Sequence, residues 1–287
     1  MSFSHEVKAE LSKHISSARH CQIAELAAMM SFAGQYGKIG ADQYMVGFQL
    51  ENEDAVRKGF TLLKKTYNIE ADVPVKESQM QDLYCKFGEF GQLVDSGLIK
   101  STCCQRAYLR GAFLCVGSMS APEKGYHLEF VCAQEDKARQ LQSVIHGFDI
   151  EAKVILRKKY YVVYLKESEA IVELLNVMGA HVALMNLENL RILKEMRNSI
   201  NRRVNCEAAN ITKTVTAASR QIEDILFLRD YYGFERLPDN LRQMAEVRLE
   251  YPEATLKELG EYLTPPVGKS GVNHRLRSLS EIADQNR

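Results

Sequence analysis

The sequence predicts an α+β protein in which a duplicated α/β domain is followed by an all-α domain. Three observations predict this: a long internal repeat, a helix followed by a period-two strand in each copy, and three short helical segments near the C-terminus. The 287 residues are more than one core usually needs and suit two domains. We place the duplicated domain at 1–195, with halves at about 1–98 and 99–195, a linker and connecting helix at 196–222, and the all-α domain at 223–287.

The repeat is defined by four landmarks that stay in register with offsets of 81 to 83 residues. The matched segments are Leu26–Gly34 with Leu109–Gly117, Tyr44–Glu51 with Tyr126–Ala133, Glu53–Asp54 with Glu135–Asp136, and Ile69–Val73 with Ile150–Val154. Chance rarely keeps four landmarks in step. A repeat of this length indicates two half-domains about a pseudo-twofold axis, because solenoid repeats recur at ~20 to 50 residues.

Each copy begins with a helix that ends in small residues. In the first copy, apolar residues at i, i+3, i+4 and i+7 from Ile23 to Met30 predict one buried helical face, and the helix ends at Ala33-Gly34. The helix of the second copy ends at Val116-Gly117-Ser118, after Gly111-Ala112. Small residues let two helices pack backbone to backbone. The alternating residues that follow each helix predict half-buried strands, namely Tyr44, Val46, Phe48 and Leu50, and Tyr126, Leu128, Phe130 and Cys132.

Bulk composition is that of an ordinary globular protein. The chain is 46% hydrophobic and 26% charged, with no apolar run near the ~18 residues that a membrane-spanning helix needs. We therefore expect a cytoplasmic protein that does not enter membranes. The seven cysteines include no C-x-x-C pair and no nearby histidine at zinc-site spacing, so we interpret them as mostly buried thiols and predict no metal and no cofactor.

Positive charge is concentrated in three runs although the net charge is zero. These runs occupy 153–166, 191–220 and 269–277. A single run is usually a solvated face, but three on a neutral protein indicate a polyanionic partner. In the first two runs the residues that we expect to make secondary DNA contacts are Arg157, Lys158, Lys159, Arg202, Arg203 and Lys213. The stretch 198–213 fits either a phosphate-contacting linker or an interdomain packing element.

The C-terminal segment has the pattern of a helix-turn-helix. Pro238 is placed to start the first helix, and Thr255 and Glu258 form a capping box that starts the second. The Pro- and Gly-rich stretch 264–271 predicts a turn. In the last helix Val272, Leu276, Leu279 and Ile282 recur at helical spacing and are expected to face inward.

The opposite face of this last helix is polar and basic. Its predicted DNA-binding residues are Lys269, Ser270, Asn273, His274, Arg275, Arg277 and Ser278. Arginine can bond guanine O6 and N7, asparagine can bond adenine N6 and N7, and Lys269 and Ser270 suit phosphate. The alternative is a trihelical protein-interaction module with a polar face. The absence of acids from this face favours double-stranded DNA.

The paired helices resemble those of the LAGLIDADG homing endonucleases. In that family the helices pack at the centre, and the acid before the final glycine of each helix holds the catalytic metal. Those positions are Ala33 and Val116, which cannot bind a hard cation. Asp42 and Glu123 follow the helices, but acids in turns are more often caps or solvated residues. The resemblance implies the scaffold without the nuclease activity.

Longer motifs extend the resemblance over the whole chain. The start Met1–Leu11 and the segments Tyr108–Leu114, Glu123–Glu129, Asn201–Asn210 and Pro266–Arg277 together resemble the WhiA family. This resemblance implies a non-catalytic, nucleoid-associated regulator of transcription, linked to cell division, chromosome segregation and, in spore formers, sporulation. Other regulatory or division proteins are expected partners of the N-terminal domain. The alternatives are a division-linked interaction protein that binds DNA weakly, and an active site-specific endonuclease.

Overall fold

The structure is a computed structural model that describes residues 2–287. It divides into two compact units, one ending at Lys194 and the other beginning at Glu195. The predicted fold class is confirmed, because the first unit mixes helices and sheets and the second is helical. None of the helices in the described residues is both long and apolar enough to cross a bilayer.

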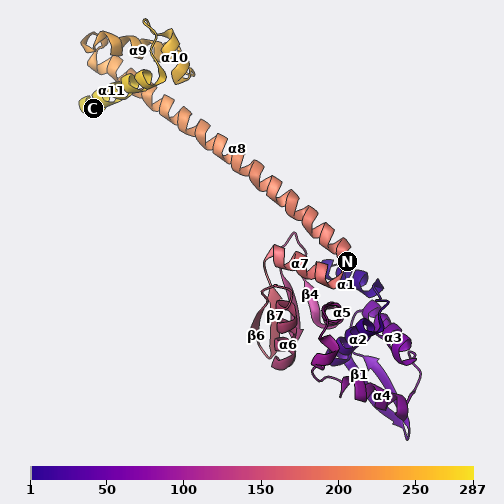
Figure 1. The fold of residues 1–287 in the computed structure, drawn as a ribbon. Helices are drawn as coiled ribbons and strands as arrows, with labels where there is room; N and C mark the ends of the chain where they lie inside the picture. Colours follow the sequence, from indigo (N-terminus) through magenta and orange to yellow (C-terminus); the bar gives the residue numbers. More distant parts are fainter. Residues whose placement is uncertain (1) are drawn as a thin grey trace. The chain divides into compact units, whose positions relative to one another are not determined.

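The first unit contains two halves of similar build (Figure 1). The elements of the first half are α1 (Phe3–Lys13), α2 (Arg19–Ala33), β1 (Gly34–Gly40), β2 (Gln43–Phe48), α3 (Glu53–Tyr67), β3 (Val75–Lys76) and α4 (Glu77–Phe87). Those of the second half are η1 (Ser96–Ile99), α5 (Thr102–Val116), β4 (Gly117–Met119), β5 (Leu128–Cys132), α6 (Glu135–His146), β6 (Lys153–Arg157), β7 (Tyr160–Leu165) and α7 (Ser168–Met178). In both halves a long helix leads directly into an antiparallel hairpin.

Helices α2 and α5 pack against each other at the centre of this unit (Figure 1). Most residues of α2 are buried around its whole circumference, as expected for a helix enclosed by protein on all sides. A Cβ atom added to Gly111 would lie only 2.5 Å from the carbonyl oxygen of Glu25. Because real Cβ atoms do not come so close to backbone, only glycine allows this helix–helix distance. The backbone-to-backbone packing predicted from the small residues is therefore present.

A buried ionic network crosses the same interface. The carboxylate of Glu25 on α2 is fully buried and forms ion pairs with Lys58 of α3 and with Arg110 of α5, whose Nε lies 3.1 Å away. The two cations also donate to backbone carbonyls, Lys58 to Leu11 at 2.7 Å and Arg110 to Met178 at 2.8 Å. Burial lowers the pKa of Lys58 to about 8, although Glu25 opposes this shift. One carboxylate thus links elements of both halves.

The two sheets differ more than the repeat predicts. The first has three strands in the order β1-β2-β3, and the second has four in the order β4-β5-β7-β6. Val154 lies in β6, whereas the matched Val73 lies in a bend before the two-residue β3. In the first half Asp72 has a positive φ of 59° and Pro74 lacks an amide hydrogen, so a long ladder cannot form there.

Helix α8 (His181–Phe227) is a single helix of 47 residues that begins in the first unit and ends in the second. Its first turn is capped by Glu10, whose carboxylate accepts hydrogen bonds from the amides of Val182 and Ala183 at 2.7 and 2.9 Å. Every residue from Glu195 to Ala217 is exposed. The segment predicted to be partly linker is therefore helical throughout.

The second unit continues from α8 with short helices around one apolar core. Its remaining elements are the π-helical turn η2 (Leu228–Tyr232), the 3-10 turn η3 (Phe234–Arg236), α9 (Asp239–Glu250), α10 (Leu256–Tyr262) and α11 (Lys269–Asn286). Ile225 of α8 is fully buried in this core together with Met244 of α9 and Leu259 of α10. The end of α8 is therefore part of the second unit.

Replacement of Glu25 by glutamine tests the ionic network. We expect Glu25→Gln to lower the free energy of unfolding of the first unit by about 3 to 5 kcal/mol, because Lys58 and Arg110 would be left buried without their anion. Hydrogen exchange in α2 and α5 at increasing urea concentration measures this free energy for the first unit alone. The control is Glu53→Gln, a side chain that is 86% exposed in an ion pair with Arg57, which should change stability by less than about 0.5 kcal/mol. Equal effects of the two substitutions would contradict the assignment.

Candidate nucleic-acid interface

Helices α9, α10 and α11 form the three-helix arrangement that the sequence predicts. Leu241, Met244 and Ala245 of α9 are buried, as are Val272, Leu276 and Leu279 of α11, while Ile282 is half-buried. The capping box at the start of α10 is present. The Thr255 hydroxyl accepts from the Glu258 amide at 3.4 Å, and the Glu258 carboxylate accepts from the Thr255 amide at 2.7 Å. This backbone hydrogen bond is the main reason why the pKa of Glu258 is lowered.

The turn between α10 and α11 depends on a close approach at Gly260. The amide of Val267 donates to the carbonyl of Gly260 at 2.9 Å, which folds the turn back over the end of α10. A Cβ at position 260 would lie 2.0 Å from the carbonyl oxygen of Val267. No side chain other than hydrogen fits there. Gly260 therefore fixes the angle at which α11 leaves the turn.

The exposed face of α11 carries most of the predicted reading residues. Lys269, Ser270, Asn273, His274 and Arg277 are exposed and lie in the first three turns of the helix. No side chain of the described residues caps α11 at Gly268, so its first amides are available to a phosphate oxygen. The first acid on this helix is Glu281, whose carboxylate lies 3.7 Å from the guanidinium of Arg277. The first three turns thus present a basic and amide-rich surface.

Two of the predicted DNA-binding residues of α11 are less accessible than the others. Arg275 is half-buried and donates from Nη1 to the carbonyl of Asn240 on α9 at 3.4 Å. Ser278 is half-buried. Arg275 consequently contributes to the packing of α9 against α11 in this structure.

The predicted secondary contacts of the first unit lie at the tip of one hairpin. Lys158 and Lys159 form the two-residue turn between β6 and β7, and both are exposed. Arg157, also exposed, is held by Glu129 of β5, with Nη2 3.1 Å from the carboxylate. Although partial burial would raise the pKa of Glu129, its hydrogen bonds from Arg157 and His127 lower it. The two lysines are therefore the freer cations of this group.

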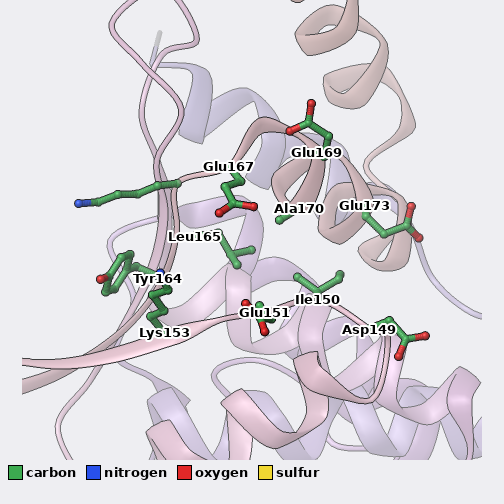
Figure 2. Close-up of a pocket in the computed structure, with 11 residues that line it drawn as sticks. Asp149, Ile150, Glu151, Lys153, Tyr164, Leu165, Glu167, Glu169, Ala170 and Glu173 are labelled. Atoms are coloured by element: carbon green, nitrogen blue, oxygen red, sulfur yellow. The ribbon is translucent and has the colours of Figure 1, made fainter.

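An acidic pocket adjoins the base of this hairpin. Figure 2 shows Glu167 and Glu151 on opposite sides of the pocket, with Glu169 and Glu173 on the neighbouring helix α7 and Asp149 at the edge. Lys153 and Lys166 are the cations in the pocket lining. Arg191 pairs with Glu169 at 3.0 Å, which leaves four carboxylates and two amines, so the pocket is acidic. An acidic surface disfavours contact with a phosphate backbone.

The remaining predicted contacts lie on α8. Arg202, Arg203 and Lys213 are exposed. Arg202 and Lys213 are eleven residues apart, about three helical turns, so they lie on the same face of the helix, whereas Arg203 is about 100° away. The face that carries Arg202 and Lys213 is suited to a polyanion.

Ala33 and Val116, the positions that the resemblance matches to the metal-binding acids of homing endonucleases, lie at the ends of α2 and α5. Ala33 is 7% exposed and Val116 is half-buried. Asp42 accepts a hydrogen bond from the Glu77 amide at 3.2 Å and therefore helps to cap α4, and Glu123 is exposed in a turn. These two acids occupy the cap and turn roles expected for them.

Comparison with known proteins assigns the family. Three family models match: the WhiA N-terminal LAGLIDADG-like domain at residues 19–81, the WhiA LAGLIDADG-like domain at 105–197, and the WhiA C-terminal HTH domain at 200–283. The chain is 50% identical over 309 aligned residues to the probable cell division protein WhiA of Lachnoclostridium phytofermentans, covering 99% of each protein. The chain belongs to the WhiA family.

Two further relatives agree with this assignment. The probable cell division protein WhiA of Alkaliphilus metalliredigens is 45% identical, with 100% of this chain and 99% of the relative aligned. The crystal structure of full-length DUF199/WhiA from Thermatoga maritima matches with a TM-score of 0.59 and 26% identity, covering 99% of both chains. The family resemblance inferred from the motifs is thus confirmed, as is the LAGLIDADG-like nature of the first unit.

One feature of this WhiA helix-turn-helix was missed by the sequence analysis. Tyr251, at the end of α9, and Tyr262, at the end of α10, stack with ring centroids 4.3 Å apart, and both remain exposed. The pair forms an exposed aromatic surface on the second unit. The two tyrosines belong to different elements, so their stacking could not be predicted from periodicity. The only local indication in the sequence is a Tyr-Pro dipeptide after an apolar helix.

Substitution at Gly260 tests the geometry of the turn. We expect Gly260→Ala to lower the stability of the second unit by about 1 to 3 kcal/mol, because the added methyl group would overlap the Val267 carbonyl. Hydrogen exchange of the α10 and α11 amides checks this. Gly268→Ala is the matched control, since a Cβ there meets nothing within 4 Å. A stable Gly260→Ala protein with native exchange rates would show that the turn is not constrained in this way.

Proposed function

We propose that this WhiA-family chain is a non-catalytic regulator of transcription that binds double-stranded DNA with α11 in the major groove. The proposal rests on the side chains that the first three turns of α11 expose. These turns expose two cations, an amide, an imidazole and a hydroxyl without an acid, on a helix whose other face is buried in a helix-turn-helix core. A recognition helix uses its N-terminal residues in this way.

The positions along α11 suggest different roles. Lys269 and Ser270 lie in the first turn of α11, beside amides that no described side chain caps. The N-terminus of a helix commonly binds phosphate oxygens through such amides. Asn273 and Arg277 are one turn apart on the same face, so both can reach base edges, asparagine at adenine and arginine at guanine. His274 lies beside them. Arg275 would contact DNA only after releasing the Asn240 carbonyl.

Nuclease chemistry is not part of the proposal. Mg²⁺ is bound by carboxylate, carbonyl or water oxygens, and the side chains at Ala33 and Val116 offer none. Asp42 is engaged at the start of α4. The inherited scaffold is instead proposed to supply a second surface, at the tip of the β6–β7 hairpin, for DNA, and further surfaces for regulatory or division proteins.

The cellular role follows from the relatives. Two relatives that align over nearly their whole length, at 50% and 45% identity, are named probable cell division proteins. We place this chain in the same process, as a regulator acting at the nucleoid in the cytoplasm. Chromosome segregation and sporulation are the further processes that family membership implies.

The reading role of Arg277 can be tested by selection from random and genomic duplex DNA at near-physiological salt. The full chain should enrich a sequence motif without cutting DNA, with or without Mg²⁺. Arg277→Ala should cost about 1 to 3 kcal/mol on the selected site and relax the base choice at one position. Arg242→Ala on α9, where the guanidinium bonds Asp239 at 2.8 Å, is the control and should leave the motif unchanged.

Each other outcome of that selection has a distinct meaning. Equal weakening on all sequences would make Arg277 a phosphate contact. Absence of any enriched motif would overturn the proposed regulator in favour of an interaction protein with weak, sequence-blind DNA affinity. Cleaved DNA ends would show that the scaffold has retained catalysis.

The hairpin tip can be tested through the salt dependence of binding. The double substitution Lys158→Ala and Lys159→Ala should reduce the slope of log K against log salt by about 1.8, since each phosphate contact contributes about 0.9. Lys64→Ala with Lys65→Ala, two adjacent exposed lysines of α3, is the matched control. An unchanged slope in the hairpin variant would remove this tip from the DNA footprint.

A further inference from the structure

The N-termini of α2 and α5 bring three thiols and an imidazole together. His20 and Cys21 lie in the first turn of α2, and Cys103 and Cys104 lie in the first turn of α5. The four potential ligand atoms are all within 4.8 Å of one another. Mostly buried thiols and no metal site were predicted from the sequence. Cys21, Cys104 and Cys132 are buried and Cys115 is half-buried, whereas Cys85, Cys103 and Cys206 are exposed. The spacing of the cysteines along the chain does not reveal this cluster.

The cluster is a product of the duplication. His20 and Cys103 are 83 residues apart, as are Cys21 and Cys104, which is within the range of offsets of the four repeat landmarks. Matched positions from the two halves meet because the helices pack together about the pseudo-twofold axis. Sequence spacing within either half cannot reveal a site that each half supplies only in part.

We propose that these residues form a structural zinc site, with His20 Nδ1 and the thiolates of Cys21, Cys103 and Cys104 as its ligands. Three cysteines and one histidine are an established tetrahedral zinc set. Zinc–sulfur bonds of about 2.3 Å and zinc–nitrogen bonds of about 2.0 Å place sulfur and nitrogen about 3.5 Å apart in a tetrahedron. The Nδ1 atom of His20 lies 3.2 Å from Cys104, 3.4 Å from Cys21 and 4.0 Å from Cys103, values that bracket this distance.

The surroundings suit a structural metal. Cys21 and Cys104 are each 5% exposed and pack with Ala18, Ala24 and Ala107, whose small apolar side chains keep water from the inner side. His20 and Cys103 are exposed and leave a path by which a metal ion can enter. With four protein ligands there is no open position for a substrate, as in closed structural sites.

Helix polarity favours the charged form of the site. Zinc with three thiolates and a neutral imidazole carries one net negative charge. The N-terminal ends of α2 and α5 both meet this cluster, and no described side chain caps either helix by a hydrogen bond. Their partial positive charges favour the thiolates. Burial raises the pKa of the Cys21 and Cys104 thiols, so zinc binding would have to displace their protons. Soft sulfur ligands select zinc over Mg²⁺, which prefers oxygen.

A disulfide switch explains the arrangement less well. Cys103 and Cys104 are consecutive residues of one helix, so their side chains diverge by about 100° and cannot bridge without unwinding it. A bridge from Cys21 to either of them would leave a third thiol and the imidazole without a role. A metal uses all four groups.

The test uses the full chain, purified with reductant, stripped with a chelator and titrated with Zn²⁺ or Co²⁺. We expect one equivalent of zinc by elemental mass spectrometry and a higher Tm for the zinc form. We also expect the absorption of tetrahedral Co²⁺ with thiolate-to-metal charge transfer. His20→Ala and Cys103→Ser change exposed side chains, so both should fold, yet each should weaken zinc binding more than about 100-fold, above the usual effect of losing an outer-shell partner. Cys85→Ser and Cys206→Ser, also exposed but outside the cluster, should bind zinc normally.

Three results would overturn the site. The first is wild-type protein that takes up no stoichiometric zinc and gives no charge-transfer band with Co²⁺. The second is full zinc content in both His20→Ala and Cys103→Ser. The third is a native disulfide between Cys21 and Cys103 or Cys104, found by peptide mass mapping of protein purified without reductant, together with unchanged Tm on addition of zinc.

Discussion

The contact between α2 and α5 determines where every other element of the first unit can lie. At Gly111 the two backbones are so close that a single added carbon would overlap the Glu25 carbonyl. Both helices pass directly into strands at their C-terminal ends, so the position of each sheet follows from the helix pair. At the other end their first turns meet and bring the four possible zinc ligands together. One helix–helix distance thus sets the geometry at both ends of the pair.

The features of the fold that are local in sequence could be predicted. Helical spacing in 23–30 and 272–282 and alternation in 126–132 identified buried faces that the structure contains. Strand β1 could not be identified, because Gly34–Gly40 has three glycines and no alternation. The length of α8 was also missed. Its polar middle was predicted to be partly linker. Residues 195–217 are all exposed, so no buried face marks this stretch as part of a helix.

The part of the candidate site that lies on the single helix α11 could be predicted from the sequence. Once Val272, Leu276 and Leu279 are assigned to the core, the opposite face of α11 is fixed by helical geometry. The hydrogen bond from Arg275 to the Asn240 carbonyl depends on where α9 lies, so it could not be predicted from the sequence. The thiol cluster could not be predicted either, because its two halves come from separate copies of the repeat. The acidic pocket likewise gathers residues of two loops, two strands and a helix.

The buried ionic network couples residues that are far apart in the sequence. Glu25 serves Lys58 and Arg110 at once, and its own backbone requires the glycine at position 111. Loss of the carboxylate leaves two buried cations without an anion, and loss of either cation leaves the buried negative charge less well neutralised. A substitution at any one of these four positions therefore disturbs the surroundings of the other three, although they lie on three helices from both copies of the repeat.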